Sequence, residues 1–352
     1  MSQFVSFLGP EGFGAYEVDL KRHAFRRVEG SPDTLLVPGF VDIHCHGAFG
    51  VDFMTASPDE MKTLGGKLSA RGYEGFLPTT VTASAEAVAR ALTNLPVDPM
   101  VLGFHLEGPF ISPKYPGAQP QSAIVDPPEL GSQWDAILDD PRLRVITMAP
   151  ERPGALSLIR KLTGRGVRVS MGHTEATYEQ ADAGFQAGAD HATHTFNAMS
   201  PLHHREPGMV GYALGNDDLF AELIYDRNHV RREAAEILFR CKPADRVVAV
   251  SDSTLATGLP AGQIVKMWGL ECVVGDRQVR LTNGTLAGSA ITLLDAFRNL
   301  HDDFGPETAI RACSLNPRKS IGLDGPPKVY FEYDRNLEMV GLHSSVLTID
   351  AD

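Results

Sequence analysis

The chain has 352 residues, carries a formal net charge of −12 and is 43% hydrophobic. A chain of this length can bury a large core, and its negative charge disfavours nonspecific binding to nucleic acid while leaving room for a local basic pocket. It shows neither the basic start and apolar core of a signal peptide nor an apolar stretch of about eighteen residues for a membrane span. The four cysteines, Cys45, Cys241, Cys272 and Cys313, have no CxxC spacing and fit free thiols. We therefore expect a cytoplasmic protein whose partners include neither nucleic acid nor a membrane.

Strand-like segments occur at both ends of the chain. At the N-terminus these are Phe4–Leu8, Gly14–Leu20 and Ala24–Val28, and at the C-terminus Val329–Tyr333, Met339–Leu342 and Ser345–Thr348. We predict that the two ends pair into a small β-sandwich subdomain of residues 1–36 and 326–352.

Between the ends, short apolar runs rich in β-branched residues recur eight times, at Leu35–Ile43, Gly75–Val81, Met100–Leu106, Leu143–Met148, Val167–Met171, His191–Thr195, Leu219–Tyr225 and Val247–Val250. Segments with helical periodicity separate most of them, including Pro58–Arg71, Ser84–Asn94, Gly154–Gly164, Thr177–Gly188 and Val230–Phe239. This alternation predicts an α/β fold with a parallel sheet. Eight such units close most simply into a (β/α)8 TIM-like barrel over residues 37–325. A doubly wound open sheet is the alternative.

Six acidic and imidazole residues lie at or next to the ends of these runs: His44, His46, Glu107, His173, His194 and Asp252. Catalytic residues of a (β/α)8 barrel stand at the C-terminal ends of its strands. The pattern therefore indicates a metal-activated water at the mouth of the barrel.

The first histidine pair is separated by one residue. His44 and His46 leave the same face of a strand and can converge on one ion, although two hydrogen-bonded polar residues would show the same pattern. Cys45 between them must point to the opposite face, so we interpret it as a packing residue.

Glu107 ends an apolar run and precedes Gly108-Pro109, which stops the strand and holds the carboxylate at a loop. A lone glutamate at such a place is usually solvated.

Two further histidines follow later strands. His173 and His194 offer neutral nitrogen donors, and histidine is the commonest metal ligand, although either one alone would fit a hydrogen-bonded core residue. His191 is three positions from His194 and faces the other side, and we choose His194 because it lies later in the strand. Together with Glu107 they provide three protein ligands with room for water, which is the open arrangement of a catalytic site.

Asp252 ends the Val247–Val250 run. A carboxylate at the end of a buried strand is costly unless it meets a cation or hydrogen-bond donors. Near a metal it can take a proton from bound water and pass it to a leaving amine. A helix N-cap is the structural alternative for this residue.

Six short motifs carry a family resemblance in their combination and order: Pro38-Gly-Phe-Val-Asp-Ile-His-Cys-His-Gly47, His105-Leu-Glu-Gly-Pro-Phe110, Gly172-His-Thr174, Thr193-His-Thr-Phe-Asn-Ala-Met199, Arg205-Glu-Pro-Gly208 and Ser251-Asp-Ser253. Over about residues 35–325 the chain resembles the amidohydrolase superfamily, and within it the N-acetylglucosamine-6-phosphate deacetylase family. The resemblance implies a metal-bearing barrel, a small β domain from both termini, and a homodimer.

The resemblance also implies roles for single residues. Glu107, His173 and His194 match the principal metal ligands, and Asp252 matches the catalytic acid/base. His44 and His46 match a pair that helps some members to bind a second metal, so we expect one or two divalent ions per chain. Zinc is the metal we expect first, with iron, manganese and cobalt as alternatives.

The positions matching the phosphate-binding residues of the family are Asn197, the backbone of Ala198, Arg205 and His229, some of them supplied across the dimer interface. A guanidinium binds phosphate oxygens in a bidentate way, although without the resemblance Arg205 would be interpreted as an exposed loop charge. Gln119 stands where many members have a histidine that contacts the substrate amide, and it can donate a hydrogen bond without becoming cationic. Leu286–Ala290 resembles a loop bordering the acetyl group.

These expectations define one function and two alternatives. The predicted reaction is hydrolysis of the acetamide of N-acetylglucosamine 6-phosphate to glucosamine 6-phosphate and acetate. A related amidohydrolase acting on N-acetylgalactosamine 6-phosphate, a cyclic ureide or a dipeptide would use the same metal core. A non-catalytic sensor of sugar phosphates is the alternative from a different class. A substrate panel and a metal assay with acetate release separate the three.

Overall fold

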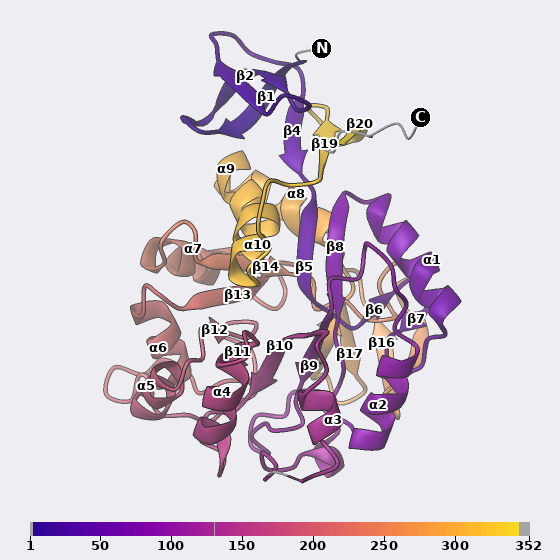
Figure 1. The fold of residues 1–352 in the computed structure, drawn as a ribbon, viewed down its shortest axis with the longest axis vertical. Coiled ribbons are helices and arrows are strands. Elements are labelled where there is room, and N and C mark those ends of the chain that lie inside the picture. Colours follow the sequence, from indigo (N-terminus) through magenta and orange to yellow (C-terminus); the bar gives the residue numbers. More distant parts are fainter. Residues whose placement is uncertain (1–2, 130, 345–352) are drawn as a thin grey trace.

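The computed structural model describes residues 3–129 and 131–344. Figure 1 shows a large barrel with helices around it and a smaller sheet at one end, where the first strands of the chain lie beside the last. The expected strand Ser345–Thr348 lies outside the described residues.

Eight parallel strands form the barrel: β5 (Phe40–Cys45), β8 (Tyr73–Pro78), β9 (Phe104–Glu107), β10 (Leu143–Met148), β11 (Arg168–Met171), β12 (His191–Ala192), β13 (Phe220–Ile224) and β14 (Val247–Val250). Strands β9 to β14 hydrogen-bond in chain order, and β5 pairs with β8. The bridges Thr79–His105 and Cys45–Ser253 join these two groups on both sides. The ring is therefore closed, so the (β/α)8 prediction is confirmed and the open sheet is wrong.

Helices cover the outside of the barrel: α1 (Pro58–Ser69), α2 (Ala85–Thr93), α3 (Asp135–Leu138), α4 (Ala155–Thr163), α5 (Tyr178–Gln186), α6 (Gly208–Gly215), α7 (Arg232–Cys241), α8 (Leu293–Phe304), α9 (Pro306–Ile310) and α10 (Asn316–Ser320). A π-helical turn (Arg311–Leu315) joins α9 to α10. Helix α4 buries Ala155, Leu158, Ile159 and Leu162, the spacing of one helix face. Helix α1 begins at a capping box, because Ser57 and Glu60 each accept a backbone N–H from the other.

The subdomain from both termini is present as one six-stranded sheet. Its strands are β1 (Gln3–Gly9), β2 (Gly12–Asp19), β3 (Ala24–Arg27), β4 (Leu35–Pro38), β19 (Val329–Tyr333) and β20 (Met339–Ser344), in the order β20-β19-β4-β1-β2-β3. It has its own apolar cluster, which includes Phe7, Tyr16, Val18 and Tyr330. The exact division at residues 36/37 and 325/326 stays a prediction.

The single strand predicted at Leu35–Ile43 is wrong, because the chain divides at Gly39. The first part, β4, pairs with β1 and β19 of the terminal sheet, whereas β5 begins the barrel. A Cβ atom at Gly39 would lie 2.7 Å from Glu74 Cβ and 2.8 Å from Val329 Cγ2, so a larger residue does not fit where the two sheets meet. An apolar run buried in two successive sheets looks like one strand in the sequence.

An antiparallel sheet of four strands follows β14 and was not predicted. It comprises β15 (Ile264–Met267), β16 (Leu270–Val274), β17 (Gln278–Leu281) and β18 (Leu286–Ser289), and the Ser253–Ser289 bridge joins it to the barrel. The dipeptide Asn283-Gly284 between β17 and β18 is a hairpin signal. A short ribbon of β6 (Gly47–Ala48) and β7 (Val51–Asp52) follows β5. Within the described residues no helix has the length and apolar character needed to cross a membrane.

Candidate metal centre

Two groups of potential metal ligands lie at the mouth of the barrel. One comprises Glu107, His173 and His194, and the other His44, His46 and Asp252; within each group the ligand atoms lie within 4.8 Å of one another, and all six residues are buried. The residues come from the ends of β5, β9, β11, β12 and β14 or from the turns directly after them. The structure therefore brings all six predicted strand-end residues together.

Glu107 joins the two groups. Its Oε1 lies 3.2 Å from His173 Nε2, 3.3 Å from His194 Nε2 and 3.2 Å from His44 Nε2. Its Oε2 lies 3.3 Å from His46 Nε2. A single carboxylate thus contacts all four imidazoles.

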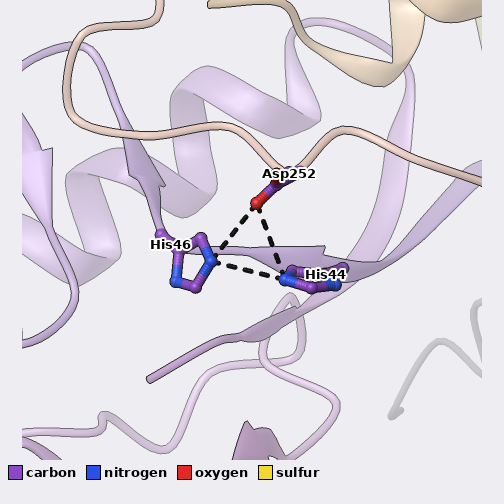
Figure 2. Close-up of side chains that lie close together, drawn as sticks. All are labelled: His44, His46 and Asp252. Atoms are coloured by element: carbon purple, nitrogen blue, oxygen red, sulfur yellow. Dashed lines mark hydrogen bonds and ion pairs between the residues drawn. The ribbon is translucent and has the colours of Figure 1, made fainter. Parts of the chain in front are cut away.

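Asp252 closes the second group, as Figure 2 shows. Its Oδ1 lies 3.3 Å from His46 Nε2 and 3.6 Å from His44 Nε2, and the two imidazole nitrogens are 3.3 Å apart. Asp252 enters this position from the loop after β14, where its backbone N–H donates to the carbonyl of His44 at 2.9 Å. The carboxylate therefore lies directly beside the ligand cluster.

Each histidine ring of the cluster is oriented through its Nδ1 atom. Backbone carbonyls accept from three of them: Thr79 from His46 at 3.1 Å, Tyr115 from His173 at 3.0 Å and Asn197 from His194 at 3.2 Å. The fourth, His44 Nδ1, lies 3.4 Å from the carboxylate of Glu222. Because these oxygens accept, each Nδ1 carries a proton and each Nε2 points to the centre, where a neutral ring offers its lone pair to a metal. Metal-binding histidines are held in this way.

The backbone after the strands adopts an uncommon conformation. His173, His194, Ala198 and Asp252 have φ of +48°, +29°, +48° and +46°. Residues other than glycine rarely adopt this region, which costs about 1–3 kcal/mol each and clusters at functional sites. The sharp turns allow strand-end side chains to face inward over the barrel.

Burial and charge together make the cluster attractive to cations. Burial alone would lower the pKa of His46, but hydrogen bonds with Asp252 and Glu107 outweigh it and raise that pKa to about 9. Burial would raise the pKa of Glu107, but the surrounding imidazoles hold it well below its usual range. The inward Nε2 atoms and two carboxylates fit a divalent ion such as zinc, iron, manganese or cobalt.

A cavity of about 220 Å³ opens onto the cluster. Among the residues expected to bind substrate, Gln119, Asn197, Ala198 and His229 line it. His229 is fixed by Asp226, whose Oδ2 lies 2.7 Å from its Nδ1. Thr285, Leu286 and Gly288 of the predicted acetyl loop or next to it also line the cavity. The cavity is therefore lined by residues of the ligand cluster, by polar groups that can hydrogen-bond a small ligand, and by apolar side chains such as Ile224 and Leu286.

Arg205 does not line this cavity. It is exposed on the loop between β12 and α6, and it borders a separate hollow together with Tyr115 and Glu175. Its guanidinium Nη1 contacts His204 at 2.7 Å. The structure of one chain thus leaves this predicted phosphate ligand apart from the other three.

Gln119 contacts the metal cluster itself. Its amide nitrogen donates to Glu107 Oε2, and its side-chain oxygen accepts from the Thr82 backbone N–H at 2.7 Å. One amide hydrogen remains for a ligand. The predicted contact with substrate therefore has to coexist with a role in holding Glu107.

Two residues of the site escaped the sequence analysis. Glu222 lies inside the apolar run Leu219–Tyr225, and a charged residue within a buried strand is a signal that was overlooked. Trp268 stands in the turn between β15 and β16, where its ring centre lies 5.3 Å from that of His46. No local pattern marks Trp268, because its position depends on how the added sheet folds over the barrel.

The closed barrel and the buried carboxylate–imidazole cluster define the class of a metal-dependent hydrolase. The amidohydrolase family model matches residues 35–326. An N-acetylglucosamine-6-phosphate deacetylase of Lysinibacillus sphaericus is 36% identical over 90% of this chain and 84% of its own. An N-acetylgalactosamine-6-phosphate deacetylase of Escherichia coli O157:H7 is 39% identical over 83% and 79%. The chain belongs to the amidohydrolase family.

A solved structure extends this likeness to three dimensions. An N-acetyl-D-glucosamine-6-phosphate deacetylase mutant of Mycobacterium smegmatis, in complex with N-acetyl-D-glucosamine 6-phosphate, superposes with a TM-score of 0.86. Sequence identity is 29%, and the match covers 98% of both chains. The terminal sheet and the barrel thus occur together in that relative.

Proposed function

We propose that the protein hydrolyses the acetamide of N-acetylglucosamine 6-phosphate to acetate and glucosamine 6-phosphate. The observation that carries this proposal is Asp252 beside a complete set of metal ligands, in a cavity that Asn197 and His229 also line. The relatives from Lysinibacillus sphaericus and Mycobacterium smegmatis are deacetylases of this sugar phosphate, and they support the choice of substrate.

Glu107, His173 and His194 would hold the first divalent ion, and His44 and His46 with Asp252 would contribute to a second. Zinc is our first choice, because mixed imidazole and carboxylate donors suit it. When bound there, a divalent ion lowers the pKa of bound water toward roughly 7 and polarises a carbonyl.

Asp252 serves as the proton carrier of the reaction. Its carboxylate takes a proton from the attacking water while the water oxygen bonds to the acetamide carbon. The same carboxyl group then delivers that proton to the sugar nitrogen as the C–N bond breaks, which releases acetate and the free amine. Asp252 lines the cavity and contacts two imidazoles, whereas Glu107 contacts four and Glu222 does not line the cavity, so we assign this exchange to Asp252.

Asn197, the Ala198 backbone and His229 bind the phosphate, and Arg205 reaches it from the partner of a homodimer. The exposed position of Arg205, outside its own chain's cavity, favours this arrangement. We further propose a cytoplasmic location, which the free thiols of Cys45, Cys241, Cys272 and Cys313 support. The division into residues 1–36 with 326–352 and residues 37–325 belongs to the same proposal.

The test combines a metal analysis with a substrate panel. The protein is purified without added metal, its metals are counted by elemental analysis, and acetate release is measured on N-acetylglucosamine 6-phosphate, N-acetylgalactosamine 6-phosphate and N-acetylglucosamine. We expect the highest kcat/KM on the first. A preference for the galactosamine epimer would instead favour the substrate of the 39% identical relative, N-acetylgalactosamine 6-phosphate. Metal occupancy without acetate release would favour the non-catalytic sensor.

A further inference from the structure

Glu222 is a buried carboxylate directly behind the metal cluster. It lies on β13 with no exposed surface. Its Oε2 lies 3.4 Å from His44 Nδ1 and accepts from the His194 backbone N–H at 3.2 Å. Its Oε1 accepts from Ser170 Oγ at 3.4 Å. The carboxylate therefore touches one residue of each ligand group.

His44 differs from the other three histidines in how its ring is held. Backbone carbonyls orient His46, His173 and His194, whereas a side chain orients His44. A carbonyl is fixed by the fold, but a carboxylate can be removed by one substitution. The orientation of the His44 ring therefore depends on one other side chain, that of Glu222.

The charge of Glu222 also needs a partner. A buried carboxylate is strongly unfavourable unless it is paired and hydrogen-bonded. Within residues 3–129 and 131–344, His44 is the basic side chain within 4.0 Å of Glu222, and no lysine or arginine ion pair to it is found. Glu107, Asp252 and Glu222 together bring three carboxylates to one buried cluster. With the four histidines neutral, as metal ligands are, one divalent ion leaves an excess of negative charge among these carboxylates, and a second divalent ion offsets it.

We propose that Glu222 is a positioning residue that orients His44 and supplies the charge needed to hold a second divalent ion at His44, His46 and Asp252. This inference rests on the proposed metal-dependent function and adds a residue that the family resemblance did not assign. Carboxylates behind metal-binding histidines raise ligand basicity, and their loss typically lowers metal affinity 10- to 100-fold.

The experiment uses Zn²⁺ alone as the probe. The full-length protein is stripped with a chelator, and Zn²⁺ binding is titrated against a competing chromophoric chelator. We expect two equivalents in the unaltered protein. Glu222→Ala should weaken the second equivalent about 10- to 100-fold and leave the first unchanged. Glu222→Gln should lose less, because its amide oxygen can still accept from His44 Nδ1 while the charge is gone.

Two further variants separate positioning from general damage. Ser170→Ala removes a contact of the other Glu222 oxygen and should bind both equivalents as the unaltered protein does. In a His44→Ala background the second equivalent is already weakened, so adding Glu222→Ala should change Zn²⁺ affinity little further. If Glu222→Ala does not fold, Glu222→Gln carries the same comparison.

Three results with the variants would overturn the proposal: wild-type affinity for both equivalents in Glu222→Ala, equal weakening of both, or a full additional loss in the His44→Ala background. Uptake of a single equivalent by the unaltered protein would also overturn it. Acetate release by the unaltered protein is measured separately. Failure of this inference is therefore distinguishable from failure of the proposed deacetylation.

Discussion

The metal cluster and the expected phosphate site are built in different ways. All six residues of the cluster are buried and come from strand ends of one chain. At the phosphate site Asn197, Ala198 and His229 line the cavity, whereas Arg205 is exposed on a loop and borders another hollow. One chain thus brings together all the groups proposed for the chemistry, whereas it leaves Arg205, one of the four residues proposed for the phosphate, outside the cavity.

Among variants that test this difference between the two sites, Glu107→Ala should have the largest effect on metal binding and turnover. The variant removes the carboxylate that contacts all four imidazoles, so metal at both ligand groups and nearly all turnover should be lost. Elemental analysis and acetate release provide the measurements. Glu307→Ala serves as the control. It removes a carboxylate on α9 that pairs with Arg311, and it should keep both the metal and the turnover. Retention of full metal by Glu107→Ala would mean that the cluster is not organised around this carboxylate.

Asp252→Asn should have the next largest effect, a loss of turnover. The amide keeps the shape of the side chain but cannot carry the proton, so kcat should fall about 10²- to 10⁴-fold. The ion at Glu107, His173 and His194 should remain, because Asp252 belongs to the other group. Elemental analysis and steady-state kinetics on the same preparation check both points. Near-normal turnover with full metal occupancy would remove Asp252 from its assigned role.

Arg205→Ala should act on binding rather than on chemistry. Charge-assisted hydrogen bonds are worth about 1.5–3 kcal/mol, so KM for the phosphorylated sugar should rise roughly 10- to 100-fold. Activity on unphosphorylated N-acetylglucosamine should stay the same and serves as the internal control. An unchanged KM for the phosphosugar would exclude Arg205 from phosphate recognition.

Mixing two inactive or impaired chains tests whether Arg205 acts across a dimer. Arg205→Ala chains retain Asp252, and Asp252→Asn chains retain Arg205. If Arg205 serves the partner's cavity, chains unfolded together and refolded as mixed dimers should contain one complete site, with a low KM. If Arg205 serves its own chain, mixing should produce only the sum of the two separate activities.

The smallest expected effect is on the pH dependence of the stability of the metal-free protein. The pKa of His46 is raised to about 9 by Asp252 and Glu107 against the opposing effect of burial, while an unfolded histidine titrates near 6.5. This interaction stabilises the fold fully below pH 6.5, and the stabilisation, on the order of 1–3 kcal/mol, is lost as the pH rises through about 9. Thermal unfolding of chelator-treated protein should show the decline, and His46→Asn should flatten it. Rising stability over that interval would contradict the assigned pair.

Much of the barrel follows from hydrophobic patterning. Buried parallel strands are continuous apolar runs, and Leu143–Met148 and Val247–Val250 were predicted with the bounds that the structure shows. Hydrophobic patterning indicates that a residue is buried, but not which element it packs against. The run Leu35–Ile43 therefore gave no sign of the break at Gly39, and the weaker alternation of β15 to β18 did not predict a separate sheet.

The candidate site divides in the same way. The sequence by itself determined which polar residues end the strands, because a charged or imidazole group at the end of an apolar run is unusual wherever it occurs, and barrel closure brings such ends together. Only the tertiary structure decided that Glu107 lies between two histidine groups, that Glu222 stands behind His44, and that Arg205 stays outside its own cavity. Those relations join residues far apart along the chain, and distances of this kind are set by how strands and loops pack, which no local pattern records.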